Sequence, residues 1–172
     1  NPCGEAANWI ASNDDAGGTP GKLNSVNAPN PDLFPPAISR VGVNDATQIT
    51  VWFTESCDSA TISNSAGYNI DNGIGNPMSV SALKPDYKVV YLTLPSALIN
   101  GTLYTLTSTG NISDCAGNTI LAGSSAKFAI PSAPEANDIV INELLYDPPT
   151  DCVDFVELFN RSTKVLDLRD LV

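Results

Sequence analysis

Short runs of alternating apolar and polar residues fill the sequence between Phe34 and Ile130, and they limit the fold more than any other feature. Polar turn residues separate the runs, whose apolar members are Val41 and Val43; Ile49, Val51 and Phe53; Val90, Leu92 and Leu94; Tyr104 and Leu106; Phe128 and Ile130. A period of two is typical of strands with one buried face, because successive side chains of a strand point to opposite sides. The pattern predicts antiparallel strands and an all-β domain.

The number and spacing of the runs indicate the architecture. Asn72-Gly73 and Asn100-Gly101 are dipeptides that favour tight turns. The second of them leads into the run Thr102–Leu106, which we interpret as the start of the sixth strand. About seven short strands over roughly a hundred residues predict an immunoglobulin-like Greek-key β-sandwich.

Composition excludes several classes of function. The chain carries 8 basic and 19 acidic side chains, a net charge of −11, and no histidine. Nucleic acid and anionic membrane surfaces bind through Lys and Arg, so neither is an expected partner. No apolar run approaches the roughly 18 residues of a membrane helix, so membrane insertion is not expected. A Ser-His-Asp triad is excluded without histidine, and the sequence has no phosphate-binding glycine loop.

The cysteines point to an oxidising compartment. Cys3, Cys57, Cys115 and Cys152 form no Cys-x-x-Cys pair, so a zinc site or a redox motif is not expected. An even number of cysteines in an acidic chain favours disulfides. The chain begins without Met or a signal peptide, from which we expect a mature or excised fragment of a secreted protein.

The central region resembles the bacterial immunoglobulin-like domain of the S-layer type. The residues that carry the resemblance are Phe53-Thr-Glu-Ser-Cys-Asp58, Gly67-Tyr-Asn69, Val90-Tyr-Leu-Thr-Leu94, Leu98–Leu106 and Ile112-Ser-Asp-Cys-Ala-Gly-Asn118. That family shows an aromatic-x-Glu-x-x-Asp strand ending, a Tyr-x-Leu strand and an Asp-x-x-Gly-Asn turn. Cys57 and Cys115 stand at variable positions of two of these motifs. In a Greek-key sandwich the second and sixth strands end on the same side, so we predict a Cys57–Cys115 disulfide.

The same argument brings Asp58 near Asp114. Carboxylate oxygens are the ligands that Ca²⁺ prefers, so these two residues are candidate calcium ligands. The alternative is that both carboxylates serve the turns in which they stand. Apart from this Ca²⁺ candidate, no cofactor is expected.

The two ends of the chain resemble lamin-tail domains, which are immunoglobulin-like sandwiches of nuclear lamins and of secreted bacterial proteins, especially of Bacteroidetes. Ile139–Pro149, Val153–Ser162 and Val165–Leu168 are similar to the opening strands of such a domain, and Asn8–Ser25 is similar to its end. The resemblance implies three parts: residues 1–32 as the end of one lamin-tail domain plus a linker, 33–132 as the bacterial Ig-like domain, and 133–172 as a linker and the first strands of a second lamin-tail domain.

Residues 1–32 are expected to be mostly irregular, with at most one short strand around Trp9-Ile10. Cys3 and Cys152 fall in the two halves of one lamin-tail template, which suggests a disulfide between them, within one chain or between two chains.

The remaining candidate sites have simpler explanations. Glu143 and Glu157 on adjacent predicted strands have the composition of a glycosidase pair, but both stand at motif positions of a non-catalytic domain. The aromatic residues Trp52, Tyr87 and Tyr91 form either a sugar-stacking platform or a pair that shields the sheet. Asp58-Ser59-Ala60 resembles a short O-glycosylation motif of Bacteroidetes proteins, which makes Ser59 a candidate for modification.

We therefore expect a non-catalytic spacer or adhesion segment of a large modular protein at the cell surface or outside the cell. Its expected partners are neighbouring modules of the same or an adjacent chain. The alternative is a glycan- or protein-binding accessory module of a secreted hydrolase or nuclease.

Overall fold

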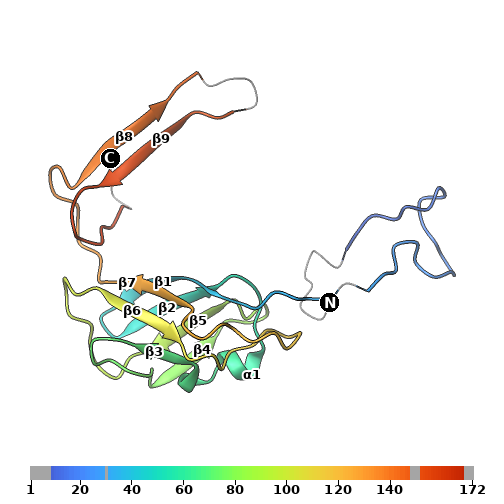
Figure 1. The fold of residues 1–172 in the computed structure, drawn as a ribbon, viewed down its shortest axis with the longest axis horizontal. Helices are drawn as coiled ribbons and strands as arrows, with labels where there is room; N and C mark the ends of the chain where they lie inside the picture. Colours follow the sequence, from blue (N-terminus) through green and yellow to red (C-terminus); the bar gives the residue numbers. More distant parts are fainter. Residues whose placement is uncertain (1–8, 30, 148–151, 169–172) are drawn as a thin grey trace.

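The protein folds as an antiparallel β-sandwich followed by a two-stranded hairpin (Figure 1). The structure, a computed structural model, describes residues 9–29, 31–147 and 152–168. In chain order the elements are β1 (Ile38–Asp45), β2 (Gln48–Phe53), α1 (Ser59–Ile62), a 3-10 helix (Ser65–Gly67), β3 (Tyr68–Ile70), β4 (Ser79–Ala82), β5 (Val89–Thr93), β6 (Tyr104–Ser108), β7 (Ser125–Phe128), β8 (Ile139–Leu145) and β9 (Phe155–Asn160). None of the described helices is long and apolar enough to cross a bilayer.

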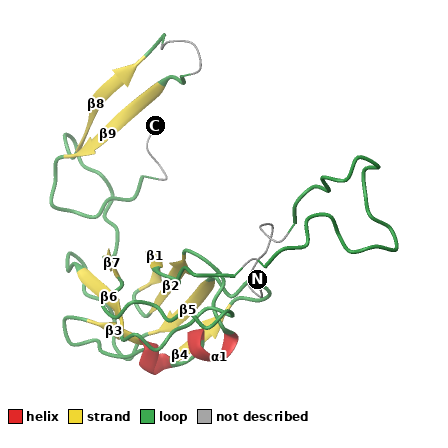
Figure 2. Cartoon of the chain, turned by 45° about the vertical axis from the view of Figure 1, so that its right-hand side comes forward, coloured by secondary structure: helices red, strands yellow, loops and turns green. Residues whose placement is uncertain are grey.

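Seven of these strands form the two layers of the sandwich. One sheet has the order β1-β2-β5-β4 and the other has the order β3-β6-β7, with every neighbouring pair antiparallel (Figure 2). The predicted all-β, immunoglobulin-like sandwich is confirmed. Asn100-Gly101 turns the chain into β6, which is the sixth strand, as the sequence predicted.

The core follows the period-two pattern. In β2 the alternate residues Ile49, Val51 and Phe53 are buried, and in β5 Val90 and Leu92 are buried while Tyr91 between them is exposed. Aromatic rings connect the layers, because Phe53 of one sheet meets Tyr68 of the other edge-on at 6.5 Å between ring centroids. The buried Tyr68 hydroxyl donates a hydrogen bond of 2.6 Å to the carbonyl of Ile62, so its polar end is satisfied inside the core.

Asn72-Gly73 forms the tight turn that the sequence predicted after β3. Both residues have positive φ, 53° and 81°, which is the requirement of a type I′ turn. Ile70 and Gly75 close the turn with a reciprocal pair of backbone hydrogen bonds. Asn and Gly suit this turn because both residues adopt the left-handed region at little cost.

Residues 9–29 contain turns and no strand, so the short strand considered at Trp9-Ile10 is absent. Both side chains are largely exposed. The segment is held by local contacts, such as the hydrogen bond between the Ser12 and Ser25 hydroxyls. Because a strand needs a neighbouring strand for its backbone groups, an alternation of only two residues does not produce one here.

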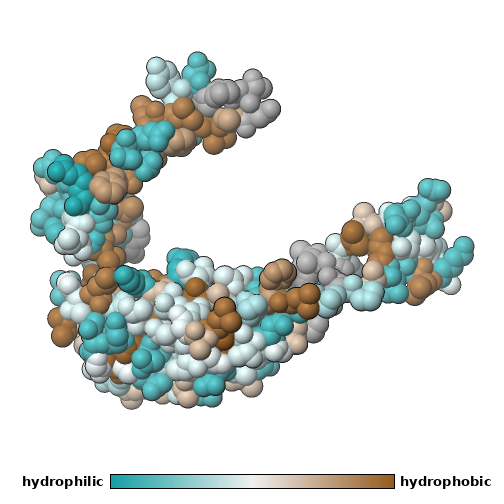
Figure 3. All heavy atoms as spheres, viewed as in Figure 1, coloured by the Kyte–Doolittle hydropathy of each residue, from teal (hydrophilic) through white to brown (hydrophobic). Residues whose placement is uncertain are grey.

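The hairpin β8–β9 exposes apolar side chains on both of its faces, and hydrophobic residues lie along the side that Figure 3 shows. One face of the hairpin carries no charged side chain. It consists of Ile139, Ile141, Leu144, Val156 and Leu158, together with Asn160. The opposite face, the acidic face, pairs Val140 with Phe159, Glu143 with Glu157, and Leu145 with Phe155. The third predicted strand, Val165–Leu168, forms only a single parallel bridge from Leu166 to Ser132.

Candidate functional site

The candidate site lies where the loops that follow β2 and β6 meet. The Asp58 amide donates to the Ser113 carbonyl at 2.8 Å, and Cys57 forms an antiparallel bridge with Asp114. The Thr61 hydroxyl of α1 accepts from the Ser113 amide at 3.1 Å. The Greek-key connection thus brings together two segments that are far apart in the sequence.

The predicted Cys57–Cys115 disulfide is wrong. Cys57 is a free thiol, whereas Cys115 is disulfide-bonded. The bridge partner of Cys57 is Asp114, one residue earlier than the prediction required. Since neighbouring residues of an extended chain point to opposite sides, the buried Cys57 side chain and the exposed Cys115 face different directions.

Cys57 is instead a core residue with an unreactive thiol. It is 3% exposed, and its Sγ lies 3.8 Å from the Glu55 carbonyl oxygen. Burial raises the pKa of Cys57 to about 12, with smaller contributions from the carboxylates of Glu55, Asp114 and Asp58. The thiol therefore stays protonated at physiological pH, and the site offers no thiolate nucleophile at this position.

Asp114 organises the loop that follows β6. Its Oδ1 accepts from the amides of Ala116 and Asn118, both at 2.8 Å, and its Oδ2 accepts from Asn118 Nδ2 at 2.7 Å. Gly117 has a φ of 94°, which glycine adopts without steric strain. The Asp-x-x-Gly-Asn motif is thus a self-contained turn, in which the Asp and Asn side chains replace backbone partners.

The same loop holds the segment that leads into the sandwich. Asn118 Nδ2 also donates to the Asp32 carbonyl at 3.1 Å. This contact brings the Asp32 carboxylate to those of Glu55 and Asp114, and one oxygen from each lies within 4.8 Å of the others. Three carboxylates at such spacing suit a hard cation such as Ca²⁺. Asp114 is already bonded to its own loop, so the cluster also has a structural explanation, and Ca²⁺ binding stays a prediction.

Asp58 does not join this cluster. Its Oδ1 accepts from the amides of Ala60 and Thr61, at 3.1 and 2.9 Å, and so caps the N-terminus of α1. Of the two candidate calcium ligands named from the sequence, Asp114 lies in the cluster and Asp58 lies outside it. Glu55 belongs to the aromatic-x-Glu motif, so the sequence could have indicated it as a member of the cluster. Asp32 stands in an irregular segment, and only the fold brings it to the cluster.

Of the predicted aromatic platform, Tyr91 is exposed, whereas Trp52 and Tyr87 are partly buried. Trp52 and Tyr91 share the outer face of the first sheet, whereas Tyr87 packs against the core. The Arg40 guanidinium lies over the Trp52 ring, 3.7 Å from its centroid. The far edge of the indole lies across Gly42, where an added Cβ would be 3.0 Å from Cζ3. Trp52 is therefore packed within its own sheet, and its stacking surface is used by Arg40.

The predicted pair Glu143 and Glu157 does stand on adjacent strands, directly opposite each other in the hairpin. Asn142 Nδ2 donates to Glu157 at 3.0 Å. Both carboxylates are exposed, on a sheet surface without a surrounding cleft among the described pockets. This arrangement gives neither residue the desolvated surroundings that a general acid needs.

The other candidates are placed as follows. Ser59 is exposed at the start of α1, and its glycosylation stays a prediction. Cys152 is a free, exposed thiol before β9, at the end of the hairpin away from the linker, so the predicted bond to Cys3 within one chain is wrong. Cys3 lies outside the described residues.

Comparisons with known proteins agree with this architecture. The chain is similar to the S-layer protein rSbsC(31–844), with 25% sequence identity and a TM-score of 0.50 over 64% of this chain. It is also similar to the N-terminal part of the bacterial S-layer protein SbsC, with 25% identity and a TM-score of 0.49, over 64% of this chain and 26% of that chain. The chain spans 15% of rSbsC(31–844). No curated protein matches it in sequence.

The family match covers the whole sandwich. Residues 26–129 match the bacterial Ig-like domain, and they contain β1 to β7 together with the loops around Asp114. This is more than half of the 172 residues. The chain belongs to the bacterial Ig-like domain family.

Proposed function

We propose that this chain is a non-catalytic structural segment, a spacer or adhesive module, of a large modular protein outside the cell or on its surface. The observation that carries the proposal is the path of the chain, which reaches the sandwich at one end and leaves it at the other (Figure 1). Modules connected in this way add their lengths in series. The likeness to one segment of an S-layer protein supports the same location.

The path follows from how the first and last strands lie. The Ile38 amide, at the start of β1, donates to the Ser124 hydroxyl at 3.0 Å, directly before β7 begins. β7 then runs from Ser125 to Phe128 beside β1 and in the same direction. The chain therefore leaves β7 at the end of the sandwich that is opposite to the start of β1.

The apolar hairpin supports neighbouring modules as partners. Exposed side chains such as Ile141, Leu144 and Val156 are each more than half accessible. A two-stranded hairpin needs further packing to be stable in water, so we propose that a neighbouring module contacts it. The finer assignments, lamin-tail segments at both ends and a Bacteroidetes source, rest on sequence motifs. The antiparallel pairing of two of the motif strands supports the first of them.

Single-molecule stretching tests the spacer role. With handles attached at the two ends, the sandwich is expected to unfold in one cooperative step, because its two sheets share one core. Residues 38–128 should release about 300 Å of extended chain. A comparison with handles on two adjacent loops at one end provides the control, since that geometry opens hydrogen bonds one at a time. Unfolding at the same low force in both geometries would contradict a role as a spacer under tension.

Glycan binding by an accessory module of a secreted enzyme is the alternative, and the Arg40–Trp52 contact argues against it. A glycan array compares the two functions directly. We expect no saturable binding. Saturable binding that is lost in both Trp52→Ala and Tyr91→Ala, but kept in the control Lys127→Ala, would favour the accessory module.

A further inference from the structure

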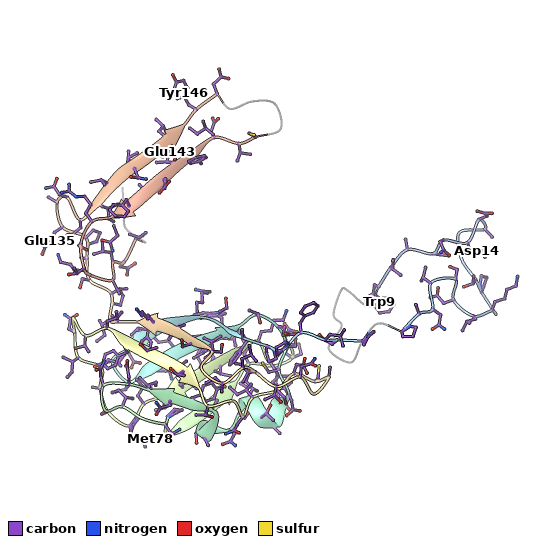
Figure 4. All side chains as sticks on the ribbon, in the orientation of Figure 1. Trp9, Asp14, Met78, Glu135, Glu143 and Tyr146 are labelled. Carbon is purple, nitrogen blue, oxygen red and sulfur yellow. The ribbon has the colours of Figure 1, made fainter. Side chains whose placement is uncertain are left out.

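The connection between the sandwich and the hairpin is closed by two segments that contact each other, residues 132–138 and residues 160–167, which together we call the clasp. Glu135 marks its position at the base of the hairpin (Figure 4). We propose that the clasp fixes the angle of the hairpin relative to the sandwich, so that the two move as one body. The proposal concerns the mechanics of the chain and holds whatever the module binds.

Backbone hydrogen bonds form the first part of the clasp. The Ser132 amide donates to the Val165 carbonyl at 2.9 Å, and the Asp167 amide donates to the Ser132 carbonyl at 3.0 Å. Both polar backbone groups of Ser132 are therefore held by the segment that follows the hairpin. In addition, the Arg161 amide donates to the Asp138 carbonyl at 2.7 Å. These bonds tie the linker before β8 to the segment after β9.

Side chains shape the two segments for this contact. On the linker, the Asp138 carboxylate accepts from the Glu135 amide at 2.9 Å and closes a turn. After β9, Asn160 folds the loop, because its Oδ1 accepts from the Ser162 amide at 3.0 Å and its Nδ2 donates to the Lys164 carbonyl at 2.8 Å. The Asn-x-Ser sequence is thus a turn that sets the position of Lys164.

Lys164 joins the two segments through its side chain. Its Nζ lies 2.9 Å from Glu135 Oε2 and 3.0 Å from Asp138 Oδ2. One ammonium group therefore bridges two carboxylates of the linker, three to six residues beyond Ser132. A geometry with two acceptors limits the freedom of the long side chain more than a single exposed pair does.

The connection between the sandwich and the clasp is a single residue long. Ile130 packs against the sandwich core, and Ser132 is already part of the clasp. Only Pro131 lies between them, and its ring fixes φ near −65°. On the outer side, Thr163 to Val165 line a small pocket together with Gly101, Leu103 and Ala129 of the sandwich. The clasp therefore also lies against the loop that leads into β6.

Distances between two spin labels test the proposal on the whole chain. The labels are placed on Ser79→Cys in β4 and Glu143→Cys in β8, in a Cys152→Ser background, because the buried Cys57 is shielded from the reagent. We expect one narrow distance distribution. Lys164→Met should broaden it at least twofold, whereas the matched control Lys127→Met, on the exposed side of β7, should leave it unchanged.

Amide exchange and a second variant make the outcome decisive. In Lys164→Met the paired amides of β8 and β9 should stay protected; if they lose protection, Lys164 holds the hairpin itself and the proposal is wrong. Insertion of Gly-Ser-Gly after Pro131 should broaden the distribution while the Ser132 and Asp167 amides remain protected. A broad distribution in the parent chain, or a narrow one in both variants, would overturn the proposal.

Discussion

At the scale of single residues, Asp114 shows how a buried carboxyl group is accommodated. It is 2% exposed, and its loop provides three hydrogen-bond donors. A polar group without partners at this depth would cost several kilocalories per mole. The pattern Asp-x-x-Gly-Asn therefore has a direct physical meaning, since the first residue accepts, Gly117 allows the turn, and Asn118 donates.

Asp114→Ala should destabilise the sandwich by about 2–3 kcal/mol, because the amides of Ala116 and Asn118 and the Asn118 side chain lose their acceptor. Urea denaturation of the wild type and the variant measures the change in the free energy of unfolding. Asp15→Ala, at an exposed position of the N-terminal segment, is the control and should stay within about 0.5 kcal/mol. If both substitutions changed the free energy of unfolding equally, the effect would come from the loss of a negative charge and not from the lost hydrogen bonds.

Cys57 should be resistant to alkylation in the folded protein. A rise in its pKa from 9.0 to about 12 lowers the thiolate fraction about a thousandfold at pH 8. Iodoacetamide should modify Cys152 first, and the difference should vanish in denaturant, where both thiols are accessible. Mass spectrometry of peptides reads both sites in one sample, so Cys152 is the internal control.

The same pKa shift predicts a loss of stability at high pH. Between pH 9.0 and about 12 the unfolded chain releases the Cys57 proton while the folded chain keeps it. The unfolded state binds fewer protons in this window, so stability falls as pH rises, by about 1.4 kcal/mol per pH unit from this residue. Cys57→Ala should be less stable at neutral pH but should show a shallower slope above pH 9.0.

At the scale of elements, the hairpin contains one unfavourable cross-strand pair. Glu143 and Glu157 stand directly opposite each other on the acidic face, between two apolar pairs. Like charges at opposed positions of an antiparallel pair are unfavourable. Asn142 donates to Glu157 and offsets part of the repulsion. The hairpin is thus held more by its apolar cross-strand pairs than by its central pair of carboxylates.

Glu143→Lys should stabilise the hairpin by about 0.2–1 kcal/mol, because an opposed ion pair replaces two like charges. Amide exchange of β8 and β9 reports the change without interference from the sandwich. Glu143→Gln removes the repulsion but adds no attraction, so its effect should be smaller. Equal protection in all three proteins would mean that the carboxylates are fully screened by solvent.

At the scale of the whole molecule, charge opposes compactness. A net charge of −11 on 172 residues repels itself in the folded state more than in the expanded unfolded chain. Three carboxylates of the folded sandwich, those of Asp32, Glu55 and Asp114, are also drawn within 4.8 Å of one another. Salt should therefore change the stability of the folded protein by screening its charges and, at that cluster, by the binding of cations.

Raising NaCl from about 10 to 300 mM should increase the melting temperature by a few degrees, because the Debye length shrinks from about 30 Å to below 10 Å. CaCl₂ at matched ionic strength separates screening from binding. A larger increase with Ca²⁺ that disappears in Glu55→Gln would support the cation site. Identical curves for the two salts would remove it.

The sequence by itself determined the sandwich, its two Asn-Gly turns and the strands β1, β2, β5, β6 and β7. Alternation such as Ile49, Val51 and Phe53 is local, and so is the requirement for positive φ at Asn72-Gly73, so both are readable without coordinates. The Greek-key order then implied correctly that the loops after β2 and β6 meet. The sequence pattern also placed Glu143 and Glu157 on adjacent strands, and the two residues are opposite each other in the hairpin.

Only the tertiary structure decided which side chains face each other across those loops. A shift of one residue sets Cys57 against Asp114 and turns Cys115 outward, which no local pattern encodes. Asp32 joins the carboxylate cluster through a hydrogen bond with Asn118, and Lys164 reaches Glu135 across the clasp. Local preferences fix the conformation of each segment, whereas the register between distant segments is set by how the whole core packs, and the chemistry of the surface depends on that register.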